Sequence, residues 1–260
     1  MGVLNLTPDS FSDGGQHLHR DAALAHAEAM VAAGADIIDI GGESTRPGAS
    51  TVSEGEEIDR VLPVIEALSS RLSCLLSIDT SKPAVMRAAV AAGAGMVNDV
   101  RALQGEGALD VACGLGVPVC LMHMQGDPAR MQWAPAYEDV VAEVTAFLLG
   151  RVAACEAAGM SRDLLLIDPG FGFGKGLGHN LELLRALPEL AALGLPLLVG
   201  LSRKAMIGAL TGKPVGERLH GSVALAVYAA LQGAAVIRVH DVGPTVEALR
   251  VIAAVQGRGW

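Results

Sequence analysis

The stretch Leu164-Leu165-Leu166-Ile167-Asp168-Pro169-Gly170 shows the pattern that decides the fold of this chain. Four apolar residues are followed directly by an acid and two turn-forming residues. A short apolar run that ends in this way is typical of a strand buried in a parallel sheet with helices on both faces. The sequence therefore predicts a strand at 164–168, with a polar side chain at its carboxyl end.

The same pattern recurs along the chain and alternates with longer stretches of helical spacing, rich in Ala, Leu and Glu. Eight such runs in 260 residues give about 33 residues per strand–helix unit, as in a barrel of ~250 residues. We predict an α/β fold, a (β/α)8 TIM barrel forming a single domain over residues 1–260. The predicted strands are 2–6, 36–40, 74–79, 95–98, 117–122, 164–168, 196–201 and 236–240.

A doubly wound sheet is the alternative fold, but its usual motifs fail in this sequence. In the glycine-rich run after 168, Lys175 stands where a dinucleotide-binding loop needs its third glycine, and Gly176 stands where a phosphate-binding P-loop needs Ser or Thr. Lys204 likewise stands where the nucleophile elbow of hydrolases needs glycine. These failures also argue against nucleophilic hydrolysis.

Composition narrows the possible partners and the compartment. Lys and Arg number 19 against 28 Asp and Glu, a net charge of −9, so we expect neither nucleic acid nor a membrane as partner. Hydrophobic residues make up 51% and charged residues 18%, which excludes a disordered chain. The 4 cysteines have no C-x-x-C spacing, and the chain starts without a signal-like segment. We expect free thiols and a cytoplasmic protein.

Polar residues follow most of the predicted strands. In a barrel these strand ends lie on one rim, where barrel enzymes have their active sites. Helix capping and turn formation explain some of them, such as Ser81 and Asp99. They do not explain the cations Arg46, Lys204 and Arg238.

The rim residues indicate two kinds of binding. Asp79, Asn98 and Asp168 come from three strand ends and suit a flat ring with adjacent N–H donors, such as a pterin or guanine, or a guanidinium group. Metal coordination is the competing use of these carboxylates, although no paired His or calcium-loop pattern supports it. The cationic set Arg46, Lys204, Arg238 and His240 would surround an anion such as phosphate.

Several motifs resemble those of the dihydropteroate synthase family. The likeness begins with Met1-Gly2-Val3-Leu4-Asn5-Leu6-Thr7-Pro8-Asp9-Ser10-Phe11-Ser12-Asp13 and includes Gly42-Glu43-Ser44-Thr45-Arg46-Pro47-Gly48. It continues in chain order through 77–83, 97–99, 122–126, 168–175, 200–204 and 238–241. Essentially the whole chain is covered, and most of the motifs lie at predicted strand ends.

The resemblance implies a barrel enzyme that joins 4-aminobenzoate to 7,8-dihydropterin-6-ylmethyl diphosphate and releases diphosphate in folate biosynthesis, with Mg²⁺ as cofactor. Residues that match the family's pterin site are Asp79, Asn98, Asp168, Lys204 and Arg238. Those that match its diphosphate site are Asn5, Arg238 and His240, with Asn5 also the metal ligand. The aminobenzoate site is matched by Phe11, Thr45, Arg46, Pro47, Phe173 and Ser202.

The resemblance also implies a reaction path and a homodimer. Diphosphate leaves once cations neutralise its charge, and the pterin delocalises the positive charge left on the methylene carbon, so an SN1-like path is expected. Asp13, Lys204 and Arg238 are the expected catalytic residues. For Asp13 an ordinary turn-forming role before two glycines is the alternative. The family is usually dimeric through late helices, and the apolar stretch 221–231 is compatible with this.

Two departures from the family and two rival functions stay open. Ala205 stands where members often have a serine whose hydroxyl contacts the aminobenzoate carboxylate. Members also usually have a further segment before the first strand, which this sequence lacks. We expect either a truncated sequence or a barrel whose bottom is less well covered than usual. The rivals are a pterin-binding module for methyl transfer to a corrinoid protein and a non-catalytic, regulatory paralogue. Diphosphate release with both substrates and Mg²⁺ would separate all three.

Overall fold

The computed structural model describes residues 1–7, 16–44, 51–126 and 135–257, without the side chains of 16–19. In this part of the chain short parallel strands alternate with helices. The strands are β1 (Gly2–Asn5), β2 (Ile37–Gly41), β3 (Leu75–Asp79), β4 (Met96–Asp99), β5 (Val119–Met122), β6 (Leu165–Asp168), β7 (Leu198–Val199) and β8 (Val236–Ile237).

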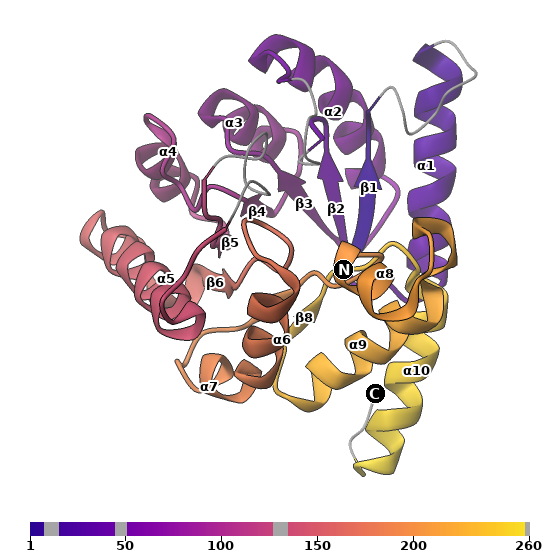
Figure 1. Ribbon diagram of the computed structural model, residues 1–260. Coiled ribbons are helices and arrows are strands. Elements are labelled where there is room, and N and C mark those ends of the chain that lie inside the picture. Colours follow the sequence, from indigo (N-terminus) through magenta and orange to yellow (C-terminus); the bar gives the residue numbers. More distant parts are fainter. Residues whose placement is uncertain (8–15, 45–50, 127–134, 258–260) are drawn as a thin grey trace.

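The helices lie outside the strands (Figure 1). They are α1 (Gln16–Ala32), α2 (Glu54–Ser69), α3 (Pro83–Ala91), α4 (Ala108–Leu115), α5 (Val140–Ala157), α6 (Leu177–Arg185), α7 (Leu187–Ala191), α8 (Ala205–Thr211), α9 (Leu219–Leu231) and α10 (Val242–Val255), with short 3-10 turns at Arg162–Leu164 and Val215–Glu217.

The eight strands close into a barrel. Strands β1 to β6 form one parallel sheet in chain order, and β7 pairs with β8. Two single bridges join these sheets, Ile167 to Leu197 on one side and Gly2 to Val239 on the other. The backbone N–H of Val3 donates to the Val239 carbonyl at 3.0 Å across the second junction. The predicted (β/α)8 barrel is therefore confirmed.

The last two strands are shorter than predicted. The runs 196–201 and 236–240 each contain only two residues with strand geometry. Beyond β8 the N–H of His240 donates to the Ser202 hydroxyl at 3.2 Å, so a side chain replaces a neighbouring strand's carbonyl as acceptor. A periodic apolar pattern cannot reveal this exchange, because it depends on two segments 38 residues apart.

The barrel core consists of aliphatic side chains, as the low aromatic content indicates. Large side chains with less than 2% exposure include Leu4, Ile38, Ile40 and Ile78 from the first strands, and Phe171 from the loop after β6. In that loop Gly170 has φ +69°, and an added Cβ would lie 1.9 Å from the His123 carbonyl oxygen. Only glycine fits there, so the chain turns sharply directly after Asp168.

The cysteines and the length of the helices are two further features of the structure. All four cysteines, Cys74, Cys113, Cys120 and Cys155, are free, as predicted. Within the described ranges, no helix combines the length and the apolar character needed to cross a membrane.

Candidate active site

Three predicted acceptors lie together at the carboxyl ends of the strands. Asp79 and Asn98 are direct register partners on β3 and β4, and Asp168 pairs with Met122 at the end of β6. All three line one pocket together with Lys204 and Arg238. The pocket is completed by Val100, Met122, Gly170, Phe171, Phe173 and Gly200.

The Asp168 carboxylate divides its two oxygens between the loop and the pocket. Its Oδ1 accepts the backbone N–H of Gly170 at 2.7 Å, which stabilises the sharp turn after β6. Burial raises the pKa of Asp168, although the Gly170 bond and the nearby Lys204 ammonium act in the opposite direction. Among the described residues the second oxygen, Oδ2, has no hydrogen-bond partner, so it can accept one from a ligand.

The Asn98 amide is oriented by a residue that the sequence analysis did not single out. Its Nδ2 donates to Asp39 Oδ2 at 3.0 Å, which leaves the amide oxygen as the atom for a ligand. Asp39 lies within β2 and is 0% exposed. An acid inside the apolar run Ile37-Ile38-Asp39-Ile40 is the signal that could have identified it, because an unpaired buried charge is costly.

Arg238 binds two carboxylates across the barrel. Its Nε donates to Asp39 Oδ2 at 2.6 Å and its Nη2 to Asp79 Oδ2 at 2.7 Å. Burial lowers the pKa of Arg238, but the two carboxylates raise it more, so the guanidinium is fully charged. A carboxylate was predicted to suit either a pterin edge or a guanidinium, and here Asp79 binds the protein's own guanidinium.

The pKa of the Asp79 carboxyl is strongly raised. Burial raises its pKa to about 7, against the lowering effect of Arg238 and with a further raising effect of Asp39. Near neutral pH the Asp79 carboxyl therefore exchanges between its charged and neutral forms. Groups with such shifted pKa values are typical of functional sites.

Lys204 closes the pocket from the side of α8. Its Nζ lies 4.2 Å from the centre of the Phe173 ring, a cation–π contact that positions both residues. Burial lowers the pKa of Lys204 to about 8, partly offset by the Asp168 carboxylate. Lys204 therefore remains mostly protonated at pH 7, within the field of Asp168.

The expected diphosphate residues lie at adjacent strand ends. The bridge between Gly2 and Val239 brings Asn5, the last residue of β1, near the segment that contains His240. The His240 Nδ1 lies 3.2 Å from the Ser202 hydroxyl, and burial together with Arg238 and Arg203 lowers the pKa of His240 to about 4. His240 is therefore neutral at pH 7. It does not contribute a positive charge to the group of cations that the sequence predicted around an anion.

A metal site made only of protein ligands does not occur in the described part of the chain, where no three His, Cys, Asp or Glu side chains gather suitably. Asn5 is half-buried, and no hydrogen bond of its side chain to another described residue is found. A single amide oxygen fits Mg²⁺ only when water and a phosphate complete the shell, which is how Mg²⁺ usually binds.

Some predicted residues lie outside the described ranges. These are Phe11, Asp13, Thr45, Arg46 and Pro47. The segment that carries the last three is flanked by an ionic cluster that the sequence analysis missed. Lys82 Nζ lies 2.8 Å from Glu43 Oε2 and 2.5 Å from Glu57 Oε2, while Glu43 Oε1 accepts the N–H of Val52 at 2.9 Å.

A second missed cluster stabilises the loop that carries Phe173. Lys175 is 2% exposed, and its Nζ donates to the carbonyls of Gly170 and Phe173 at 3.0 Å each. It also lies 2.8 Å from His123 Nδ1. Burial lowers the pKa of Lys175 to about 7 and that of His123 to about 3, so the histidine is a neutral acceptor. This lysine shapes the loop and does not bind phosphate as a P-loop lysine does.

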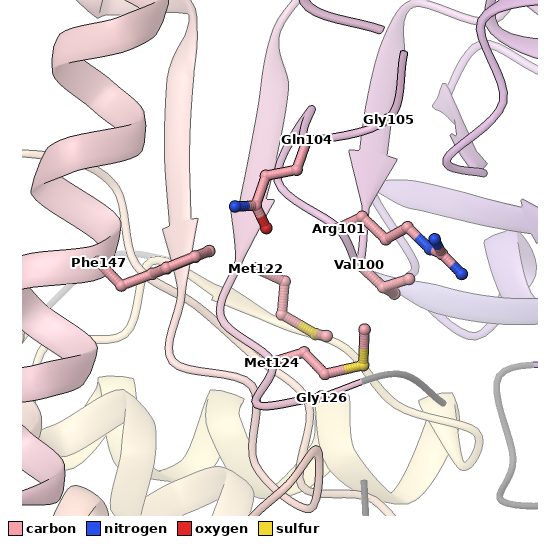
Figure 2. Close-up of a pocket in the computed structure, with 8 residues that line it drawn as sticks. All are labelled: Val100, Arg101, Gln104, Gly105, Met122, Met124, Gly126 and Phe147. Atoms are coloured by element: carbon pink, nitrogen blue, oxygen red, sulfur yellow. The ribbon is translucent and has the colours of Figure 1, made fainter. Parts of the chain in front are cut away.

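A second cavity of about 140 Å³ lies between the segments that follow β4 and β5, beside α5. Val100 and Met122 line both this cavity and the acceptor pocket, so the two are neighbours. Figure 2 shows Phe147 and the two thioethers of Met122 and Met124 around it, with the Arg101 guanidinium pointing away.

Known dihydropteroate synthases are similar to this chain over nearly its whole length. The sequence profile of a family described as "Pterin binding enzyme" matches residues 1–240. The chain is 57% identical to dihydropteroate synthase of Escherichia coli K12 over 254 residues, which is 98% of this chain and 90% of the relative. Its identity to the Haemophilus influenzae dihydropteroate synthase is 53%, over 96% of this chain and 91% of that protein.

Solved structures of dihydropteroate synthases also superpose closely on this chain. The Yersinia pestis dihydropteroate synthase in complex with a sulfonamide drug superposes with TM-score 0.94 at 56% identity, covering 99% of this chain and 94% of the other. The Xanthomonas albilineans enzyme with 4-aminobenzoic acid gives TM-score 0.94 at 56% identity, covering 100% and 93%.

Proposed function

The chain belongs to the pterin-binding enzyme family, and we propose how the mouth of its barrel works as a dihydropteroate synthase. This transferase joins 4-aminobenzoate to 7,8-dihydropterin-6-ylmethyl diphosphate and releases diphosphate in folate biosynthesis. We assign the site because three hydrogen-bond acceptors, Asp79, Asn98 and Asp168, line one pocket.

The three acceptors recognise the donor edge of the pterin. Asp168 has one oxygen left after its bond to Gly170, and Asn98 has its amide oxygen left after its bond to Asp39. Both atoms accept N–H groups, and the Asp79 carboxylate adds a third acceptor. Lys204 donates to the carbonyl side of the ring, and Arg238 contacts its face. A ring with acceptors on its recognition edge would leave these buried groups unpaired, which costs about 1–3 kcal/mol each.

The reaction itself needs charge stabilisation more than proton transfer. As the carbon–oxygen bond to diphosphate breaks, negative charge grows on the leaving group and positive charge on the pterin methylene. Arg238 and Lys204 stabilise the leaving group, while Asp79 and Asp168 stabilise the cationic pterin. The aniline nitrogen of 4-aminobenzoate is neutral at pH 7, attacks the methylene carbon without a strong general base, and then loses one N–H proton to water. This order of events is an SN1-like path, in which Asp13 would assist.

The diphosphate lies near Asn5, Arg238 and His240 in this proposal. His240, neutral at pH 7, donates a hydrogen bond instead of a charge. Mg²⁺ would be held by the Asn5 amide oxygen, and when bound it neutralises charge on the diphosphate. Because Asn5 offers one ligand, we propose that the ion enters together with the diphosphate.

The aminobenzoate subsite is built next to the Lys204–Phe173 contact. Phe173 and Ser202 are its described members, with Phe11, Thr45, Arg46 and Pro47 as the others. Ser202 contacts His240, so it would join this subsite to the diphosphate subsite. The helix α8 begins at Ala205, where the family's serine hydroxyl is lost, and backbone N–H groups would take its place.

The proposed enzyme is a cytoplasmic homodimer. Exposed apolar side chains lie on α8, α9 and α10, among them Leu210, Leu231, Val251 and the 78% exposed Val255, and α9 packs directly on α10. Burial of such a surface against a second copy would stabilise a dimer. The four free thiols and the net charge of −9 support a cytoplasmic protein without nucleic acid or membrane partners.

The test is diphosphate release on mixing the protein with both substrates and Mg²⁺, followed by a coupled phosphate assay. Reactions without 4-aminobenzoate and with the Asp168→Asn variant are the negative controls. Asp163→Asn, at an exposed acid before β6, is the matched control and should react normally. Pterin binding without diphosphate release would identify a non-catalytic pterin-binding protein and contradict the proposal.

A further inference from the structure

The two carboxylates that bind Arg238 occupy different depths of the barrel. Asp79 is the last residue of β3, its side chain is 12% exposed, and it lines the pocket. Asp39 is the third of five residues in β2, its side chain is 0% exposed, and it is not among the described residues that line the pocket. A ligand in the pocket can therefore reach Asp79 but not Asp39.

A single oxygen of Asp39 binds two functional side chains. Its Oδ2 accepts from Arg238 Nε at 2.6 Å and from Asn98 Nδ2 at 3.0 Å. An asparagine amide has a donor end and an acceptor end, and rotation by 180° exchanges them. Asp39 accepts one N–H of the Asn98 amide, which fixes the orientation of the amide and keeps its oxygen as an acceptor for the ligand.

Arg238 uses separate nitrogens for its two partners. Nε binds Asp39, whereas Nη2 binds Asp79. The pocket has about 30 Å³ of free space, room for little more than a water molecule. A bicyclic ring that binds Asp79 must therefore displace side chains, and the Nη2 contact occupies one of the two Asp79 oxygens that such a ring would use. The Nε contact to Asp39 lies deeper and need not change.

We propose that Asp39 is a positioning residue that sets the donor–acceptor pattern of the pterin pocket. It orients Asn98 so that the pocket accepts hydrogen bonds, and it retains Arg238 while Asp79 exchanges the guanidinium for the pterin. This inference rests on the proposed function and adds to it a residue that selects the substrate's edge. Asp39 itself does not touch the substrate.

The neighbouring strand provides a matched control. Ser77 is the register partner of Asp39, so the two side chains lie on the same face of the sheet. Ser77 is equally buried, and within the described residues its hydroxyl makes no hydrogen bond. Ser77→Ala therefore changes the barrel interior beside Asp39 without removing a contact of Asn98 or Arg238.

The test compares two ligands, a dihydropterin and its analogue with a carbonyl oxygen in place of the 2-amino group. Binding is measured by titration calorimetry on the full-length chain. The wild type and Ser77→Ala should prefer the amino compound. In Asp39→Ala the Asn98 amide rotates freely and can donate to the carbonyl, so the preference should fall by tenfold or more. An unchanged preference in Asp39→Ala would overturn the proposal.

A second variant covers the case in which Asp39→Ala does not fold. Asp39→Asn keeps the shape of the side chain but removes the negative charge that competes with Asp79 for Arg238. The KM for the pterin substrate should rise about tenfold, while the KM for 4-aminobenzoate stays unchanged, a split that a general folding defect would not produce. Equal KM values in Asp39→Asn and wild type would refute the role of Asp39. A wild type that neither binds pterin nor releases diphosphate would instead refute the proposed function.

Discussion

Replacement of Asp168 by asparagine is the most direct test of pterin recognition. Oδ1 of Asp168 accepts the Gly170 N–H at 2.7 Å, and in the proposed complex Oδ2 accepts from the pterin. In Asp168→Asn the amide oxygen must take the Oδ1 position, because the amide nitrogen cannot accept the Gly170 N–H. The NH2 group then points at the donor edge of the pterin.

The expected loss follows from the burial of the site. Asp168 is 5% exposed, so water cannot compensate for the mismatch. A hydrogen bond to a charged group contributes about 1.5–3 kcal/mol, and a buried donor left without an acceptor costs about 1–3 kcal/mol. Together these amount to about 2.5–6 kcal/mol, a loss of roughly 10²- to 10⁴-fold in pterin affinity at 1.4 kcal/mol per factor of ten.

Titration calorimetry with a dihydropterin measures this loss, and urea unfolding measures stability on the same samples. Stability should change by less than about 1 kcal/mol, because the Gly170 bond is kept. The Asp163→Asn control should bind normally. If folded Asp168→Asn bound the pterin within a few fold of wild type, Asp168 would not face the ligand, and the acceptor pocket would be wrong.

Three further predictions concern charge, pH and the order of binding. Lys204→Ala and Arg238→Ala should each lower kcat/KM by roughly 10²–10³ in steady-state assays, and full activity in either variant would exclude that side chain from catalysis. The Asp79 pKa of about 7 in the folded state lies above the value of 3.8 in the unfolded chain. Between these two pH values the folded state binds more protons than the unfolded state. The contribution of Asp79 to the free energy of unfolding therefore falls as pH rises from 4 to 7. Urea unfolding at several pH values should therefore show the stability of wild type falling relative to Asp79→Asn over this range, and parallel profiles would contradict the shift. Calorimetry should detect 4-aminobenzoate only after diphosphate and Mg²⁺ are added, with EDTA abolishing the signal, whereas equal binding without them would indicate a preformed subsite.

Local sequence patterns were sufficient for the fold and for much of the site. Apolar runs ending in polar residues predicted all eight strands, because a buried strand needs a continuous apolar segment and a turn needs particular residues after it. Asp79, Asn98 and Asp168 could be identified in the same way, since each ends a strand and barrel strands end on one rim. The structure then placed all three in one pocket.

The tertiary structure decided which groups are paired and which remain for a ligand. Arg238 was predicted among the cations that surround an anion, and the structure shows it bound to Asp39, 199 residues away, and to Asp79, 159 residues away. His240 was predicted among the cations, but its burial beside Arg238 keeps it neutral. Hydrogen bonding and desolvation depend on neighbours brought together by barrel closure. Sequence alone therefore determined the residue types at the rim, whereas their partners, charges and free acceptor atoms depend on contacts between distant strands.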